Sequence, residues 1–297
     1  APTHFYALAA RDRVCRAGGS CVTKDRGGER FPRPSQAPED LSGLVALFDV
    51  GLERAAQRLV KVLPASGLSP VDRSYLAWMH ARAGDVQAST TLSRALVEIP
   101  EVASEPAVLA FGYPRAFVDV VKKEAKRSGV PPELLYAVMR EESGFNPSAL
   151  SPRGARGLMQ MIPKTARRMA ASAGVGRFSL RQLYKPEVSI RLGAHYLKLL
   201  LEEFDGDLAA ALASYHAGEK TVARWKRRNK NLSVDEFIEE IPYSSTRGYV
   251  KKVLGTYGTY RLLYGTDGRP LPELDGGSAP EASRTMISPS PLARRSK

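Results

Sequence analysis

The chain has 297 residues, 43% of them hydrophobic, which is enough for one large domain or two smaller ones with real cores. No apolar run approaches the roughly 20 residues that a membrane-spanning helix needs, so we expect no transmembrane segment. The net charge of +13 would suit nucleic acid or another anionic polymer, but the basic residues are scattered and no nucleic-acid-binding motif accompanies them. We therefore expect no nucleic-acid partner.

The first predicted region covers 1–112. It begins with Ala1 rather than Met, which is typical of a processed or excised piece, so the missing leader says nothing about export. A short helix near its start is followed by Cys15 and Cys21, the only cysteines. Their spacing is not a zinc pattern, and both a small disulfide loop and two unrelated thiols are compatible with it.

Helical patterns follow a turn-rich connector at 25–39. Apolar residues at helical spacing predict helices within 52–63, 75–83 and about 86–98. Short helices joined by tight turns indicate helical hairpins of a solenoid. Because the exposed end of a solenoid needs a cover, we expect this region to pack on the remainder of the chain.

Gly112-Tyr113-Pro114 marks the predicted boundary, and a helix at about 115–128 follows. The next helix, about 132–143, carries the strongest candidate for catalysis. At about 100° per residue its apolar residues centre near Glu142, whereas Glu141 lies roughly 90° away, at the edge of the apolar stripe. A carboxyl in apolar surroundings resists ionisation, so we expect Glu142 to have a raised pKa and to be a general acid.

Taken alone, a glutamate at a helix end is more often a solvated charge than a catalyst. The neighbouring residues favour the catalytic interpretation, because Ser143-Gly144 ends the helix and Asn146-Pro147 prevents it from restarting. The loop at 146–157 that follows carries Gly154 and Gly157, which allow positive φ and close backbone approach.

The remaining chain is predicted to be helical. We expect helices at about 163–173, 186–204, 208–217, 219–229, 233–240 and 244–264. Gly193, in the middle of a long helix, indicates close packing, and the catalytic helix is the expected neighbour. The tyrosines of the last helix are expected to pack with their hydroxyls at the surface. Few residues favour strands, so the predicted fold class is all-α.

Three motifs in this order resemble the soluble lytic transglycosylases, which cleave peptidoglycan and have a goose-type lysozyme fold. The motifs are Glu142-Ser143 with Ser151-Pro152-x-Gly154-Ala155-x-Gly157-Leu158-Met159-Gln160, then Ser214-Tyr215-His216-Ala217-Gly218, then Glu239-Glu240-Ile241-Pro242-Tyr243 leading into Thr246-Arg247-Gly248-Tyr249-Val250.

The resemblance implies a domain organisation. Residues 1–112 resemble the last hairpins of the helical superhelix that precedes the catalytic domain in this family. Residues 113–266 would be the catalytic domain, and the proline-rich stretch 267–297 would be a disordered tail.

The resemblance also implies a reaction and a place. Glu142 would protonate the β-1,4 bond between N-acetylmuramic acid and N-acetylglucosamine and would then act as base, leaving a 1,6-anhydro ring. The partner would be the glycan strands of peptidoglycan in the periplasm or cell envelope. No metal or other cofactor is needed.

Further site residues are carried over by motif. Ser151 and Gln160 would hydrogen-bond the saccharide or the acid, and Tyr215 would orient the acid. Glu239 would help to hold the reacting centre. Tyr243 and His216 would complete the substrate-binding set.

Two positions depart from the family's pattern. His216 stands where Asn is common, which suggests pH-sensitive substrate binding because histidine titrates near neutrality. Ser245 stands where Glu is common, which puts any salt bridge there in doubt. Two alternative functions remain at this point: a lysozyme-type hydrolase on the same fold, and a helical adaptor that binds glycan or protein without turnover.

Overall fold

The computed structural model describes residues 33–36, 38, 40–103, 105–228 and 232–265, and these residues form helices and loops without a β-strand. The predicted first helix, Cys15 and Cys21, and the predicted tail at 267–297 lie outside the described residues. Every described helix is too short or too polar to cross a lipid bilayer.

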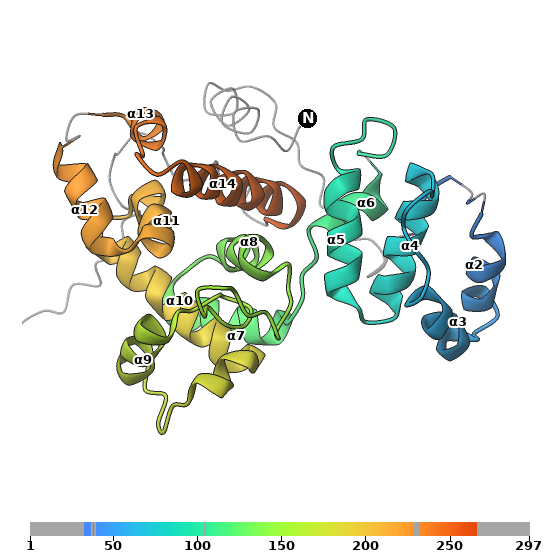
Figure 1. Ribbon diagram of the computed structural model, residues 1–297, viewed down its shortest axis with the longest axis horizontal. Coiled ribbons are helices and arrows are strands. Elements are labelled where there is room, and N and C mark those ends of the chain that lie inside the picture. Colours follow the sequence, from blue (N-terminus) through green and yellow to red (C-terminus); the bar gives the residue numbers. More distant parts are fainter. Residues whose placement is uncertain (1–32, 37, 39, 104, 229–231, 266–297) are drawn as a thin grey trace, which may run out of the picture.

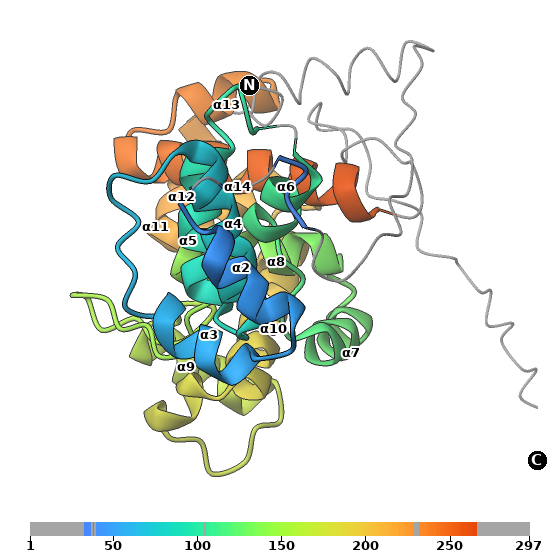
Figure 2. The same ribbon diagram turned by 90° about the vertical axis from the view of Figure 1, so that its right-hand side faces the viewer.

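Among the described residues, the first part of the chain forms five helices: α2 (Ser42–Asp49), α3 (Glu53–Val60), α4 (Pro70–Arg82), α5 (Val86–Leu96) and α6 (Pro106–Gly112). Side-chain caps define where the two longest begin: Ser69 accepts from the Asp72 amide at 3.1 Å and Asp85 from the Ala88 amide at 3.0 Å. In Figure 2, which faces this end of the molecule, α2 and α3 lie in front of α4 and α5.

The second part contains α7 (Val118–Ser128), α8 (Pro132–Ser143), α9 (Pro163–Ser172), the short 3₁₀ helix η1 (Leu180–Tyr184), α10 (Pro186–Glu203), α11 (Leu208–Ala217), α12 (Glu219–Arg228), α13 (Val234–Glu239) and α14 (Ser244–Tyr264). The predicted bounds of the catalytic helix and of the last helix are confirmed. The sequence analysis did not identify α2, α6 and η1, which have five to eight residues, although it did identify α3 and α13, which are equally short.

α8 is buried on all sides rather than along one stripe. Seven consecutive residues, Leu134 to Arg140, are buried, so they cover every side of the helix. α14 lies across one side of α8, with α7 and α10 on the opposite side (Figure 1). Helices that are buried all round have no polar face, so the one-sided prediction was too narrow.

The tyrosines of α14 correct another prediction. Tyr260 is fully buried and stacks on Tyr136 with ring centroids 5.4 Å apart. Its hydroxyl donates to the carbonyl of Pro114 at 2.8 Å, and the hydroxyl of Tyr264 donates to the carbonyl of Tyr113 at 2.9 Å. These hydroxyls therefore face the predicted boundary segment rather than water, because a buried phenol requires a partner.

The first part packs on the second, as expected. The main core includes Leu96 at the end of α5 and Val108 in α6, together with residues of α7 to α14. A second, smaller cluster holds Phe48, Trp78 and Phe111. The main core therefore crosses the boundary that we predict at residues 112 and 113.

Candidate active site

Glu142 lies in the last turn of α8, directly before the residues that end the helix. Gly144 ends it in the left-handed conformation, at φ 57°. The hydroxyl of Ser143 bonds the Met139 carbonyl at 3.1 Å and the Leu158 carbonyl at 2.9 Å. The turn that carries Glu142 is thereby attached to the loop behind it.

The surroundings of the Glu142 carboxyl raise its pKa. Burial raises its pKa to about 7, the nearby phenol of Tyr249 opposes this rise, and the charge of Glu141 adds to it. A carboxyl with this pKa is protonated in a large fraction of molecules at neutral pH. The predicted general acid is therefore chemically competent to donate a proton.

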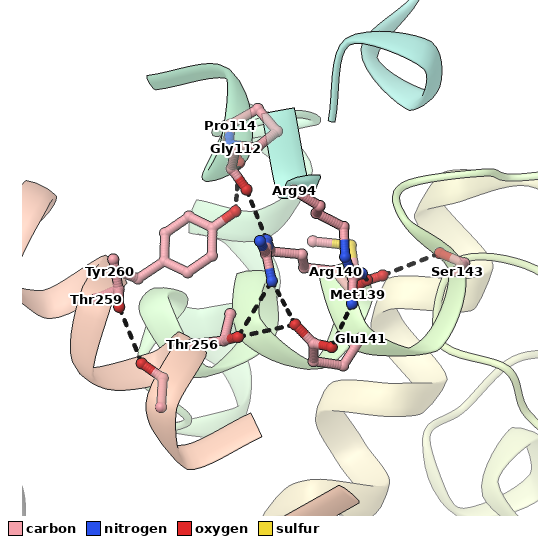
Figure 3. A network of polar contacts seen from close by, with 11 residues as sticks. Arg94, Gly112, Pro114, Met139, Arg140, Glu141, Ser143, Thr256, Thr259 and Tyr260 are labelled. Carbon is pink, nitrogen blue, oxygen red and sulfur yellow. Dashed lines mark hydrogen bonds and ion pairs between the residues drawn. The ribbon is translucent and has the colours of Figure 1, made fainter. Parts of the chain in front are cut away.

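Glu141 has the opposite character. Burial would raise its pKa, but the charges of Arg140 and Arg94 and the hydroxyl of Thr256 outweigh that effect and lower it. Its side chain is only 5% exposed, which its predicted place at the edge of the apolar stripe did not indicate. Figure 3 shows the network that stabilises it as an anion inside the protein.

Two phenols lie near the Glu142 carboxyl, from two further helices. The charge of Glu142 raises the pKa values of both Tyr215, on α11, and Tyr249, on α14, after the larger effect of burial. The Tyr215 hydroxyl donates to the Met159 carbonyl at 2.7 Å. The Tyr249 hydroxyl is buried beside the acid. Among the described residues, no acceptor or donor lies in hydrogen-bonding geometry to this hydroxyl.

Tyr249 is a site residue that the sequence reasoning missed. We assigned it to packing, although it stands in the Thr-Arg-x-Tyr-Val motif on which the resemblance rests. The motif was the available signal. The helical period could not separate Tyr249 from the three packing tyrosines of the same helix.

The loop behind the acid is stiffened by its own polar side chains. Ser151 accepts from the Ala155 amide at 3.0 Å, and the Gln160 amide donates to the Gly157 carbonyl at 2.9 Å. Isolated antiparallel bridges join Arg156 to Leu150 and to Met161. Ser151 and Gln160 therefore shape the loop, whatever they contact in a substrate.

Two glycines let this loop approach its neighbours, as the sequence indicated. Gly157 has φ 73°, and a Cβ there would lie 1.9 Å from the Leu183 carbonyl oxygen. A Cβ at Gly193 would lie 2.5 Å from the Met159 side chain. The close packing at Gly193 is therefore confirmed, but its neighbour is the loop and not the catalytic helix.

The remaining predicted residues lie on the elements around Tyr249. His216 stacks on the Tyr249 ring with centroids 4.8 Å apart, and its Nδ1 is 3.0 Å from the Thr246 hydroxyl. Burial lowers the pKa of His216, and Arg153 lowers it further. Both effects favour the neutral imidazole.

Glu239 and Tyr243 are exposed. Glu239 pairs with Lys251 at 2.7 Å, and its side chain is 48% exposed. Tyr243 packs edge-on against Trp225 with centroids 5.1 Å apart. The structure thus brings Glu142, Tyr215, Tyr249 and His216 into one connected group, whereas Glu239 is linked to Lys251.

Two other features of the described part bear on chemistry. A cavity of about 420 Å³ lies between α4 and α5, lined by His80, Asp85 and Leu92 among others, and it is far along the chain from Glu142. Within the same residues no three His, Cys, Asp or Glu side chains gather in a way that could hold a metal ion.

Comparison with known families identifies the second part of the chain. Residues 119–238 match the model of the family described as "Transglycosylase SLT domain". This chain contains a transglycosylase SLT domain. The matched range includes Glu142 and the loop behind it and ends before α14, so Tyr249 lies outside it.

Curated relatives of the SLT domain are murein transglycosylases. The soluble lytic murein transglycosylase of Escherichia coli K12 is 36% identical over 155 residues, 52% of this chain and 24% of that protein. The membrane-bound lytic murein transglycosylase C of Haemophilus influenzae PittGG is 30% identical over 178 residues, 53% of this chain and 49% of that protein. The chain spans about a quarter of the length of the soluble relative.

Solved structures share the fold over most of the chain. The 70 kDa soluble lytic transglycosylase of Escherichia coli superposes with a TM-score of 0.70 at 25% identity, over 91% of this chain and 42% of that one. An inactive mutant of the lytic transglycosylase Slt from Pseudomonas aeruginosa gives 0.64 at 24% identity, over 87% and 41%. The fold is therefore all-α and lysozyme-like, with helical hairpins before the SLT domain.

Proposed function

We propose that the chain is a peptidoglycan lytic transglycosylase that cleaves the β-1,4 bond between N-acetylmuramic acid and N-acetylglucosamine without water, with Glu142 as its catalytic residue. The observation that carries this proposal is the Glu142 carboxyl at the end of α8, which is partly buried and whose pKa is raised to about 7 by that burial. The match to the SLT domain and the names of the murein-cleaving relatives support the substrate class.

The reaction uses one carboxyl twice. Neutral Glu142 protonates the glycosidic oxygen, and the bond between that oxygen and C1 of muramic acid breaks. The muramic acid C6 hydroxyl then attacks C1, and its proton passes to the Glu142 carboxylate, which restores the acid. The product has a 1,6-anhydro ring and no water has been added, so atoms and protons balance. Proton transfers of this kind contribute about 10²–10⁴-fold to the rate.

Tyr249 stabilises the anionic stage of this cycle. After the first transfer Glu142 is charged and buried, and the phenol beside it favours that form. Tyr215 holds the adjacent Met159 carbonyl and so maintains the loop next to the acid. We further propose that Ser151, Gln160, His216, Glu239 and Tyr243 contact the saccharide.

Hydrolysis on the same fold is the second candidate. Most glycoside hydrolases use a second carboxylate as base or nucleophile. Glu141 is the neighbouring carboxylate, but it is committed to Arg94, Arg140 and Thr256. This commitment favours the mechanism that needs only one carboxyl. The adaptor without turnover is disfavoured, since an adaptor has no need of a buried carboxyl with a pKa of about 7.

We also propose that the protein acts in the cell envelope, where murein lies. The curated relatives are named as soluble or membrane-bound murein transglycosylases. We propose in addition that 1–112 is a helical-hairpin region, that 113–266 is the catalytic domain and that 267–297 is a disordered tail.

Digestion of purified sacculi tests the function. The wild type should release muropeptides that end in 1,6-anhydromuramic acid, identified by mass spectrometry. Glu142→Gln should release none, in line with the inactive Glu-to-Gln mutant of the Pseudomonas aeruginosa enzyme. Release of the same products by Glu142→Gln, or binding without release by the wild type, would refute the proposal.

A further inference from the structure

Arg94, in α5, reaches from the first part of the chain to the end of the catalytic helix. Its Nη1 donates to the Arg140 carbonyl at 3.0 Å, and its Nη2 donates to a Glu141 carboxylate oxygen at 2.9 Å (Figure 3). The Arg140 carbonyl lies in the last turn of α8 and also accepts the amide of Gly144, the residue that ends the helix, at 3.1 Å. Arg94 thus binds both the Arg140 backbone and the Glu141 side chain, directly before Glu142.

The residues around Arg94 form a network between four helices. Arg140 donates to Glu141 at 2.5 Å, and Thr256 of α14 donates to the same oxygen at 2.8 Å. The Nε of Arg140 donates to the Gly112 carbonyl at 2.6 Å. α5, α6, α8 and α14 therefore meet at Arg140 and Glu141, the two residues that precede the acid.

We propose that Arg94 is a positioning residue of the active site, which fixes the last turn of α8 and balances the charge of Glu141 so that Glu142 keeps its place and its proton affinity. This inference rests on the proposed function of Glu142. Arg94 lies outside residues 119–238, so the match to the SLT domain assigns it no role.

The electrostatic part follows from the groups that face Glu142. These are Glu141 on its own helix, Tyr215 on α11 and Tyr249 on α14. Glu141 is the only anion of the three at neutral pH, and Arg94 is one of the two cations that pair with it. Without Arg94 the charge of Glu141 acts on Glu142 with less compensation, which disfavours ionisation of the acid.

Titration of Glu142 by NMR, with isotope-labelled glutamate and with Glu142→Gln to assign its signal, tests this directly. Arg94→Gln should raise the pKa of Glu142 by about half a unit, the size expected for a unit charge near the surface. Arg94→Lys should raise it less, because lysine keeps the charge but not both hydrogen bonds.

Arg127→Gln is the matched control. Arg127 is also an exposed arginine, 44% exposed, that pairs with a buried glutamate, Glu124, but on α7. The Arg127→Gln substitution should leave the pKa of Glu142 unchanged. The pH–rate profile on sacculi should agree: its upper limb moves up in Arg94→Gln, kcat falls severalfold, and Arg94→Lys recovers part of both.

An unchanged Glu142 pKa in folded Arg94→Gln would overturn the inference, and so would a shift of the same size in Arg127→Gln. If Arg94→Gln does not fold, Arg94→Lys takes its place: a raised Glu142 pKa in this variant supports the inference, and an unchanged pKa overturns it. A pKa shift in Arg94→Gln together with a wild type that releases no product would instead refute the proposed function and support the coupling of Arg94 to Glu142.

Discussion

Glu141 and Glu142 are adjacent in the chain, yet their carboxyls meet different partners. Arginines and a threonine surround Glu141 and lower its pKa, whereas burial dominates at Glu142 and raises its pKa to about 7. The raised pKa at Glu142 could be predicted from the apolar residues of its own helix. The burial of Glu141 could not, because Arg94 and Thr256 are 47 and 115 residues away in the sequence.

The two glutamates should respond to pH in opposite directions. The folded pKa of Glu142 lies above its unfolded value, so its ionisation reduces stability as pH rises from about 4.5 to 7. Glu142→Gln should therefore raise the free energy of unfolding by about 3 kcal/mol at high pH and have little effect in acid. The folded pKa of Glu141 is lowered, so its contribution is present above its unfolded pKa and is lost in acid.

Glu141→Gln is the control for this comparison. It should lower stability by about 1–3 kcal/mol near neutral pH, because it leaves two arginines without a carboxylate. Urea unfolding of both variants and the wild type across the pH range measures the difference. The same sign of effect for both substitutions near pH 8 would contradict the assigned ionisation states.

Tyr249→Phe should alter the acid without disturbing the fold. The Tyr249 phenol lowers the pKa of Glu142, so its removal should move the upper limb of the pH–rate profile above 7 and reduce kcat. Tyr264→Phe is the matched control, since it removes a phenol of the same helix that bonds the Tyr113 carbonyl instead. Kinetics in which both variants shift the limb equally would remove Tyr249 from the site.

At the scale of elements, the loop behind the acid is held by glycine geometry. Gly154 and Gly157 both have positive φ, as their place in the loop indicated, but only Gly157 faces a carbonyl, that of Leu183. The sequence could predict the first property, which depends on the residue itself. It could not predict the second, because Leu183 belongs to η1, an element of five residues that has no detectable period.

The two glycines therefore provide a matched pair of substitutions. Gly154→Ala should cost about 1 kcal/mol of stability, since it meets only the strain of positive φ. Gly157→Ala should cost about 3 kcal/mol or more and should reduce activity, because its Cβ would displace the Leu183 backbone next to the loop of the site. Urea midpoints that fall equally in the two variants would show that the Leu183 contact is unimportant.

At the scale of the whole molecule, α5 and α6 join the two cores. Leu96 and Val108 belong to the main core, whereas Leu92 and Phe111 pack in the smaller cluster. The sequence could predict that the first region packs on the second, because solenoid ends need a cover. It could not predict which residues do so, since the contacts join segments far apart in the sequence.

This sharing should make the described part unfold as one unit. The chain has two tryptophans, and Trp78 lies in the smaller cluster while Trp225 lies in the main core. Trp225→Phe therefore leaves Trp78 as the fluorescent reporter of the smaller cluster, and Trp78→Phe leaves Trp225 as the reporter of the main core. Their fluorescence midpoints in urea, corrected for the stability of each variant measured by circular dichroism, should coincide. A clearly earlier midpoint at Trp78 would show that the hairpins unfold separately.

The measurement that bears most directly on the account is the mass of the new product end when sacculi are digested in water enriched in heavy oxygen. If Glu142 alone transfers both protons and the C6 hydroxyl is the nucleophile, the wild type leaves 1,6-anhydromuramic acid that contains no heavy oxygen. A reducing end that carries the heavy isotope would show that water attacks, and it would contradict the transglycosylase mechanism.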